Sequence, residues 1–134
     1  MWEHGQVHLL PAERSRQRVI DGNRVCRAIA ALEDPAAVRE RARRFALLAD
    51  PTRLTLLGCI HAAGPISVSD LAAATGIADT TVSQTLRHLR SNQAVVADRD
   101  GKVMRYRLAD PAVAELLANT GSLQVTSAER RRAR

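Results

Sequence analysis

Apolar residues recur at helical spacing through most of the chain and alternate with polar ones in one short region. The clearest helical stripe consists of Val82, Leu86 and Leu89, which fall at positions i, i+4 and i+7. This spacing predicts a helix over residues 78–91, with Asp79 capping its first backbone N–H groups. The opposite face of this helix bears hydrogen-bonding side chains and no carboxylate: Thr80, Thr81, Ser83, Gln84, Arg87 and His88.

Two Asp-Pro pairs predict the starts of two earlier helices. Asp34-Pro35 and Asp50-Pro51 each place a capping carboxylate before a proline, which fits the first position of a helix. The pattern assigns Phe45 and its apolar neighbours to one face of the first helix. Its other face bears Arg39, Arg41, Arg43 and Arg44.

A short helix precedes residues 78–91. Ser67 and Asp70 stand in a capping-box arrangement at its start, and Gly76 ends it in a tight turn. Two helices joined through a glycine-containing turn predict a helix-turn-helix, whose second helix would lie in the major groove of DNA.

Alternating residues after this motif predict a β-hairpin. The strands are 94–97 and 103–108, and Asp100-Gly101 lies at the bend. A basic hairpin directly after a helix-turn-helix is typical of a wing, and Arg99, Lys102 and Arg105 are positioned to contact phosphates or the minor groove. Asp110-Pro111 then predicts a last helix that ends near Asn119.

These elements predict a mostly α-helical protein with a small β-hairpin, a winged helix-turn-helix. Three regions are expected: an N-terminal arm over residues 1–34, a DNA-binding and dimerisation domain over 35–120, and a basic tail over 121–134. At 134 residues the chain can build a modest core, to which a second subunit would add buried surface.

Composition favours an anionic partner. The formal net charge is +6, and Lys102 is the only lysine among 20 basic residues. Arginine suits forked contacts to phosphates and base edges, and on this helix Gln84 can bond adenine at two points while Arg87 does the same to guanine. Three aromatic residues are too few for stacking on single strands. The partner is therefore expected to be double-stranded DNA.

Other classes of protein find little support in the sequence. No Ser/His/Asp set, paired carboxylates or phosphate-binding glycine loop predicts an enzyme. No segment is long and apolar enough for a signal peptide or a membrane span, and two cysteines cannot form a disulfide framework. A cytoplasmic protein is expected.

Three segments resemble motifs of a known family of repressors. The segment 45–54, Phe-Ala-Leu-Leu-Ala-Asp-Pro-Thr-Arg-Leu, resembles the Ala-Asp-Pro-x-Arg-Leu signature of the ArsR/SmtB family. Residues 81–89 are similar to that family's recognition helix, and residues 101–110 to its wing and strand exit. The resemblance covers residues 38–117 and implies a homodimeric repressor that binds a palindromic operator and releases it when an inducer, commonly a metal ion, binds.

The resemblance also implies roles for particular positions. Thr80, Ser83, Gln84 and Arg87 stand where family members read bases or hold phosphates. Dimerisation is implied through the first and last helices of the domain. The apolar positions expected to need a partner surface are Leu47, Val113, Leu116 and Leu117.

The usual metal sites of the family are not intact in this sequence. Serines replace the two cysteines of the soft-metal motif, at Ser67 and Ser69, and Asp110 is followed by no histidine. A remaining possibility is a thiophilic ion as inducer, held by Cys26 on the arm with Cys59 or His61; no cofactor is otherwise expected. His4 and His8 form a further pair, four residues apart.

Three functions therefore stay open at the level of sequence. The first is a sequence-specific repressor released by an inducer. The second is a thiol-responsive repressor of the same fold, in which Cys26 and Cys59 form a disulfide. The third is a winged-helix module used only for protein contacts.

Overall fold

A computed structural model describes residues 2–3, 6–7 and 9–120 of the chain, with the side chains of 9–119. The chain forms two compact units, residues 1–41 and 42–134. The predicted boundary followed residue 34, whereas this division falls later, inside a helix. His4, His8 and the basic tail lie outside the described residues.

The elements that lie wholly within the first unit are short. Strands β1 (Trp2–Glu3) and β2 (Gln6–Val7) pair antiparallel, a 3₁₀ turn spans Ala12–Arg14, and helix α1 spans Gly22–Ala30. The Asp21 side chain caps α1 by accepting a hydrogen bond from the Arg24 N–H. Cys26 is buried in α1.

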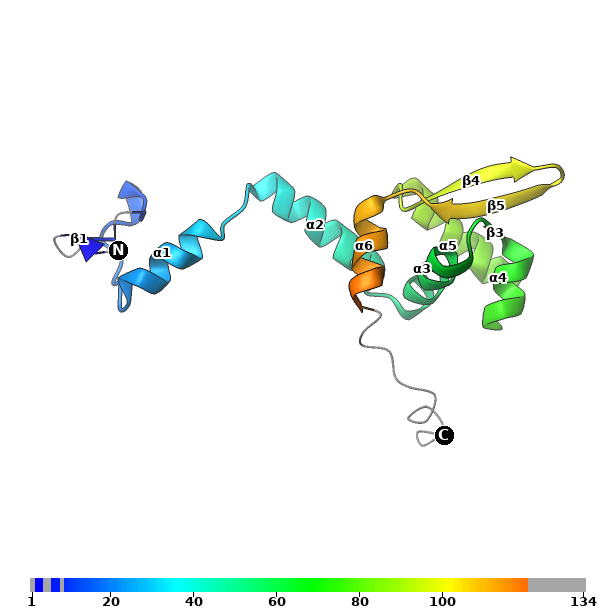
Figure 1. Cartoon of the computed structure of the whole chain (residues 1–134), viewed down its shortest axis with the longest axis horizontal. Coiled ribbons are helices and arrows are strands. Elements are labelled where there is room, and N and C mark those ends of the chain that lie inside the picture. Colours follow the sequence, from blue (N-terminus) through cyan, green and yellow to red (C-terminus); the bar gives the residue numbers. More distant parts are fainter. Residues whose placement is uncertain (1, 4–5, 8, 121–134) are drawn as a thin grey trace, which may run out of the picture. The chain divides into compact units, whose positions relative to one another are not determined.

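The second unit carries the predicted helices and hairpin, as Figure 1 shows. Helix α2 begins in the first unit and continues into the second. The elements are α2 (Pro35–Leu48), α3 (Pro51–Ala63), β3 (Ile66–Ser67), α4 (Val68–Thr75), α5 (Asp79–Ser91), β4 (Val95–Asp100), β5 (Val103–Leu108) and α6 (Pro111–Thr120).

Local side-chain caps explain where several helices begin. Asp34 accepts a hydrogen bond from the Ala37 N–H, and Asp50 accepts one from the Arg53 N–H at 2.9 Å. Ser67 Oγ accepts from the Asp70 N–H at 3.2 Å at the start of α4. These three predicted caps are confirmed, because each depends only on residues three positions apart.

Arg53 also ties α3 back to the end of α2. Its Nε donates to the Leu47 carbonyl at 2.9 Å, and its Nη2 donates to the Ala46 carbonyl at 3.0 Å. Carbonyls in the last turn of a helix have no partner within that helix, and the forked guanidinium satisfies two of them. The Asp-Pro-Thr-Arg segment thus starts one helix and caps the preceding one.

The sheet of the second unit has one more strand than the sequence indicated. Its order is β3-β5-β4, all antiparallel, and β3 is only two residues long, too short to show an alternating pattern. In the hairpin, Asp100 pairs with Val103 across a two-residue bend. Gly101 adopts a φ of 63° there, a left-handed conformation that glycine adopts without strain.

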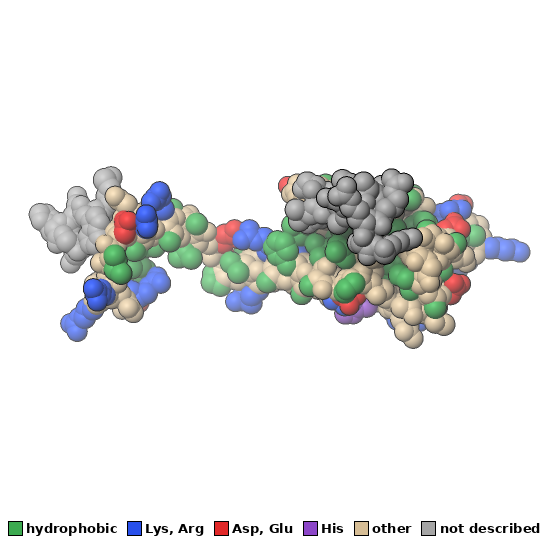
Figure 2. Space-filling view, turned by 90° about the horizontal axis from the view of Figure 1, so that it is seen from below, with side chains coloured by type: hydrophobic (Ala, Val, Ile, Leu, Met, Phe, Trp, Pro, Cys, Tyr) green, Lys and Arg blue, Asp and Glu red, His purple; other side chains and the backbone are tan. Residues whose placement is uncertain are grey.

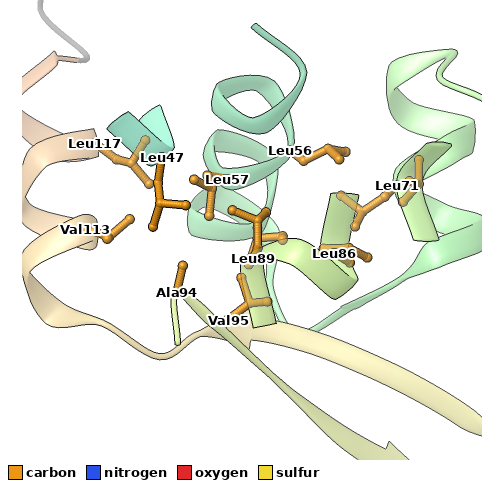
Figure 3. Packing of buried hydrophobic residues seen from close by; sticks show 12 residues of the cluster. Leu47, Leu56, Leu57, Leu71, Leu86, Leu89, Ala94, Val95, Val113 and Leu117 are labelled. Atoms are coloured by element: carbon orange, nitrogen blue, oxygen red, sulfur yellow. The ribbon is translucent and has the colours of Figure 1, made fainter. Parts of the chain in front are cut away.

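A single apolar core holds the second unit together, and Figure 3 shows its side chains meeting between the helices and the sheet. Leu47, Val113 and Leu117 are buried in it, and Leu116 is half-buried. The prediction of a partner surface is therefore wrong for Leu47, Val113 and Leu117, since α2 and α6 pack them into the chain's own core, and it stays a prediction for Leu116. The core comprises Leu47, Leu56, Leu57, Ile60, Leu71, Val82, Leu86, Leu89, Ala94, Val95, Val113 and Leu117.

Helix α2 is rotated about its axis relative to the prediction, so that a different face is buried. Arg43 and Arg44 are half-buried, whereas the Phe45 side chain is 52% exposed. The arginines turn inward because each finds a polar partner elsewhere in the second unit. Phe45 and Leu54, which is 42% exposed on α3, are left as large apolar side chains on the surface.

Among the described residues, no helix has both the length and the apolar character that crossing a membrane requires.

Candidate nucleic-acid interface

Helix α5 has two chemically distinct faces. Val82, Leu86 and Leu89 are fully buried in the core, as their spacing predicted. The six polar residues singled out from the sequence are all exposed: Thr80, Thr81, Ser83, Gln84, Arg87 and His88. The buried stripe fixes how the helix is rotated, so these side chains are presented together to solvent.

The start of α5 corrects one prediction. The N-cap is Ala78, which makes no side-chain cap, and Asp79 is the first helical residue. The helix thus begins at the predicted cap residue itself, and the cap position falls one residue earlier. As the acidic residue of the first turn, Asp79 still interacts favourably with the positive end of the helix dipole.

The turn before α5 is built by local hydrogen bonds. Gly76 has a φ of 74° and donates its N–H to the Ala72 carbonyl, which ends α4. Thr75 Oγ1 donates to the Leu71 carbonyl at 2.7 Å and accepts from the Ile77 N–H at 3.2 Å. Ile77 is half-buried and packs against the core. Together these contacts set the corner between α4 and α5.

The wing carries its charges in two groups. On one face Arg105 pairs with Asp100 at 3.1 Å, and Arg107 pairs with Asp98 at 2.7 Å. Arg99 and Lys102 are exposed and form no ion pair with any described residue. In Figure 2, basic side chains project at the right-hand end, where Figure 1 places the hairpin bend.

The sequence predicted that Arg105 contacts a phosphate, but in the structure this arginine is already paired with a carboxylate. Its side chain is 38% exposed and held by Asp100. To reach DNA it must exchange this carboxylate for a phosphate. Exposed ion pairs contribute only about 0–1 kcal/mol, so the exchange is feasible. Arg99 and Lys102 need no such exchange.

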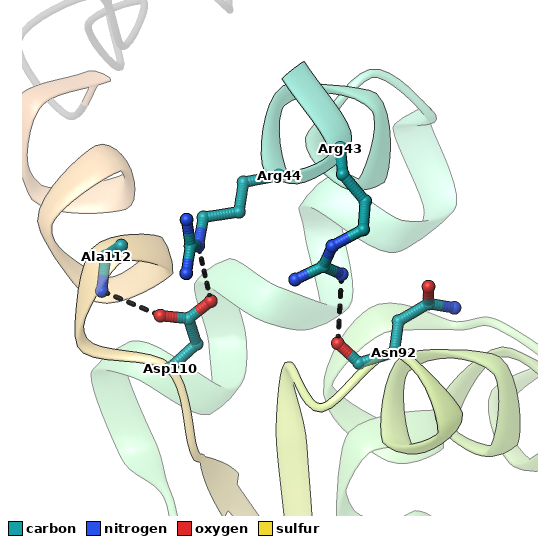
Figure 4. A network of polar contacts seen from close by, with 5 residues as sticks. All are labelled: Arg43, Arg44, Asn92, Asp110 and Ala112. Carbon is teal, nitrogen blue, oxygen red and sulfur yellow. Dashed lines mark hydrogen bonds and ion pairs between the residues drawn. The ribbon is translucent and has the colours of Figure 1, made fainter. Parts of the chain in front are cut away.

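Two arginines of α2 bind groups that are far from them in sequence, one just after α5 and one just before α6 (Figure 4). Arg43 Nη1 donates to the Asn92 carbonyl at 3.1 Å, just past the end of α5. Arg44 Nε donates to Asp110 Oδ2 at 2.7 Å, and the other Asp110 oxygen accepts from the Ala112 N–H at 3.0 Å at the start of α6. Sequence periodicity missed this network, because its partners are far apart in the chain.

The network also determines the ionisation of Asp110. Burial acts to raise the pKa of this carboxyl. Hydrogen bonds from Arg44 and the Ala112 N–H, with the charges of Arg44 and Arg43, outweigh burial and lower the pKa below its ordinary value. The carboxylate therefore stabilises the fold above the ordinary aspartate pKa of about 4, and this contribution is lost as the pH falls through the lowered pKa.

The candidate metal ligands are not brought together within either unit. Cys26 lies in the first unit, whereas half-buried Cys59 and exposed His61 lie on α3 in the second. No group of three or more His, Cys, Asp or Glu side chains suited to a metal ion occurs among the described residues. The buried Ser67 hydroxyl already caps α4, and Asp110 is engaged by Arg44.

Comparison with known proteins places these features in context. Residues 48–96 match the model of a helix-turn-helix domain. The HTH-type transcriptional regulator NmtR of Mycobacterium tuberculosis is 42% identical over 84 residues, which span 63% of this chain and 69% of that protein. The transcriptional repressor SmtB homolog of Synechocystis is 41% identical over 78 residues, which span 58% of this chain and 58% of that protein. The second match thus covers less than two thirds of the relative's own length.

Solved structures show the same fold. The crystal structure of the AntR antimony-specific transcriptional repressor superposes with a TM-score of 0.64 at 36% identity, covering 69% of this chain and 83% of that one. A second match is the solution structure of the homodimeric winged helix-turn-helix domain of Mb0332 from Mycobacterium bovis, a possible ArsR-family transcriptional regulator. Its TM-score is 0.58 at 34% identity, covering 70% of this chain and 88% of that one.

Proposed function

The chain belongs to the ArsR/SmtB family of winged helix-turn-helix transcriptional repressors, and from this premise we propose that it binds an inverted-repeat operator in double-stranded DNA as a homodimer. The observation that carries the proposal is the exposed face of α5, which presents six hydrogen-bonding side chains without a carboxylate among them. We propose that the chain has no catalytic activity and acts in the cytoplasm, as a DNA-binding repressor of this family would.

Base recognition is assigned to the middle of α5. Gln84 has the two adjacent hydrogen-bonding groups that match adenine in the major groove, and Arg87 has the fork that matches guanine. Thr80, Thr81, Ser83 and His88 are assigned to phosphates and neighbouring base edges. Two such helices related by a twofold axis require half-sites about one helical turn apart.

Replacing Gln84 with alanine tests this assignment. Affinity for the operator is expected to fall by about 1–3 kcal/mol, because the adenine loses both of its hydrogen bonds. Affinity for random duplex DNA is expected to change little. Fluorescence anisotropy with an operator selected from a random pool and with a scrambled duplex measures both quantities.

The matched control is Gln17→Ala, which removes the same side chain from an exposed position in the first unit. It is expected to bind both DNAs like the wild-type protein. Equal losses on the two DNAs for Gln84→Ala would move that residue from the bases to the phosphate backbone.

Dimerisation is assigned to the apolar side chains that the fold leaves on the surface of α2 and α3. Phe45 and Leu54 are both large, apolar and roughly half exposed. Aromatic side chains are enriched in protein–protein contacts relative to the rest of the surface. We propose that they pack against the same residues of the partner subunit.

We further propose that binding of an inducer releases the operator. The AntR repressor is described as antimony-specific, so a thiophilic ion is a reasonable inducer to test. The residues at the family's usual positions do not fit a metal. The Ser67 hydroxyl and the Asp110 carboxylate both have structural partners, and the described part of the chain holds no group of three or more His, Cys, Asp or Glu side chains suited to a metal ion.

Cys26 stays the proposed anchor for such an ion. Cys26→Ser is expected to abolish release of a fluorescent operator by Cd²⁺ while leaving operator binding of the metal-free protein unchanged, because a serine hydroxyl is a poor ligand for a soft ion. Anisotropy and the ultraviolet thiolate-to-metal absorption report the two effects separately. Ser69→Ala is the control, expected to keep wild-type sensitivity. Full Cd²⁺ sensitivity in Cys26→Ser would direct the search to His4 and His8.

A further inference from the structure

Two consecutive arginines of α2 bind backbone and side-chain groups that lie far from them in sequence. The Arg43 guanidinium is 49 positions away from the Asn92 carbonyl that it binds, and Arg44 is 66 positions away from Asp110. Both partners lie at helix ends: Asn92 is the C-cap of α5, and Asp110 precedes α6. Figure 4 shows the two guanidinium groups diverging from neighbouring positions on one helix.

These contacts differ from ordinary surface ion pairs in their burial and completeness. The Arg44 and Asp110 side chains are 26% and 14% exposed, so solvent screens their attraction only partly. Both carboxylate oxygens of Asp110 accept hydrogen bonds, one from Arg44 and one from the Ala112 N–H. The pair therefore holds the start of α6 against α2 in one orientation.

At the end of α5, Arg43 binds a main-chain group. The Asn92 side chain donates to the His88 carbonyl at 3.0 Å, which closes the last turn, and the Asn92 carbonyl accepts from Arg43. A bond to the backbone fixes the position of the helix end itself. The apolar stripe of α5 controls the rotation of the helix, whereas this bond restrains the direction of its C-terminal end.

We propose that Arg43 and Arg44 are positioning residues for DNA recognition: they fix the end of α5 and the start of α6 on α2, and so set the geometry of the two recognition helices in the dimer. This inference rests on the proposed dimer, in which α2 carries the interface. A helix of 13 residues is about 20 Å long, so a swing of about 10° moves its far end by about 3 Å. Such a shift is nearly one base-pair step and would move side chains out of register with the bases.

This role differs from a simple contribution to stability. A stabilising contact, when removed, lowers the melting temperature and weakens binding to every DNA alike. A positioning contact, when removed, lowers the preference for correctly spaced half-sites, because the recognition helices then sample several separations. The dependence of affinity on half-site spacing separates the two.

The experiment compares full-length wild-type protein with Arg43→Ala and Arg43→Lys. Anisotropy measures binding to a selected inverted repeat, to the same repeat with one or two base pairs added or removed between half-sites, and to a scrambled duplex. Arg39→Ala is the matched control, since it removes an exposed arginine of the same helix and the same charge. Thermal unfolding shows which variants are folded at the assay temperature.

Arg43→Ala is expected to bind the optimally spaced operator about tenfold more weakly, the effect of losing one hydrogen bond from a charged donor. Its preference for the optimal spacing should flatten, and its binding to scrambled DNA should match that of Arg39→Ala. Arg43→Lys keeps the charge but not the planar fork, so an intermediate profile is expected. If Arg43→Ala does not fold, the spacing profile of Arg43→Lys is used to test the inference.

Three results would overturn the inference. An unchanged spacing profile in folded Arg43→Ala would show that the contact does not orient α5. Equal losses on operator and scrambled DNA, beyond those of Arg39→Ala, would show a role in stability alone. If the wild-type protein showed no optimal spacing, the proposed binding of a dimer to an inverted repeat would itself be contradicted, and this inference with it.

Discussion

Raising the salt concentration from 50 to 200 mM is expected to weaken operator binding roughly a thousandfold. Each protomer offers Arg87, Arg99 and Lys102 as exposed cations on α5 and the wing, and the dimer doubles this set. Arg99 and Lys102 lie against phosphates, and Arg87 brings its charge into the groove between the two phosphate strands; six such cations displace enough counterions for a slope of log affinity against log salt of about −5. Anisotropy titrations at several salt concentrations measure that slope.

The wing accounts for most of this expected effect. Replacing Arg99 and Lys102 together with glutamine removes four charges per dimer and should reduce the loss over the same salt range to roughly tenfold. Arg105→Gln is the matched control on the wing. Because Asp100 already neutralises Arg105, its removal is expected to change the slope less than removal of Arg99 alone. Wild-type affinity that hardly responds to salt would mean that the wing does not contact phosphates.

Replacing Phe45 with glutamate is expected to raise the dimer dissociation constant by at least about a hundredfold. The interface would lose the burial of an aromatic side chain and gain a carboxylate, and twofold symmetry places both changes twice in each dimer. An effect of about 1.4 kcal/mol per protomer already corresponds to that factor. Sedimentation equilibrium measures the constant, and operator affinity should fall with it.

The matched control for Phe45→Glu is Val103→Glu. Val103 is a 40% exposed apolar residue on the wing, away from α2 and α3 in sequence. Its replacement is expected to leave the monomer–dimer equilibrium unchanged and to weaken only DNA binding. If Phe45→Glu remains dimeric at micromolar concentration, the interface must use a different face.

Elements with local signals could be predicted from the sequence. Asp50 and Ser67 cap helices through bonds to residues three positions on, and Gly76 and Gly101 adopt the left-handed turns that their positions indicated. The apolar stripe of α5 defined its buried face, and with it the exposed candidate contacts. Each of these features depends on neighbours in the chain, so the sequence alone was sufficient for them.

Tertiary structure decided which way α2 faces. Periodicity placed Arg43 and Arg44 on the open face and Phe45 inside, yet the arginines turn inward to Asn92 and Asp110. The two-residue strand β3 likewise forms only because β5 pairs with it. By itself the sequence determined where the helices of the second unit, their turns and the recognition face lie, because those signals act over three or four residues; it did not indicate α1 in the arm. The orientation of α2 required the fold, because its arginines gain their hydrogen bonds only when residues 49 and 66 positions away are brought beside them.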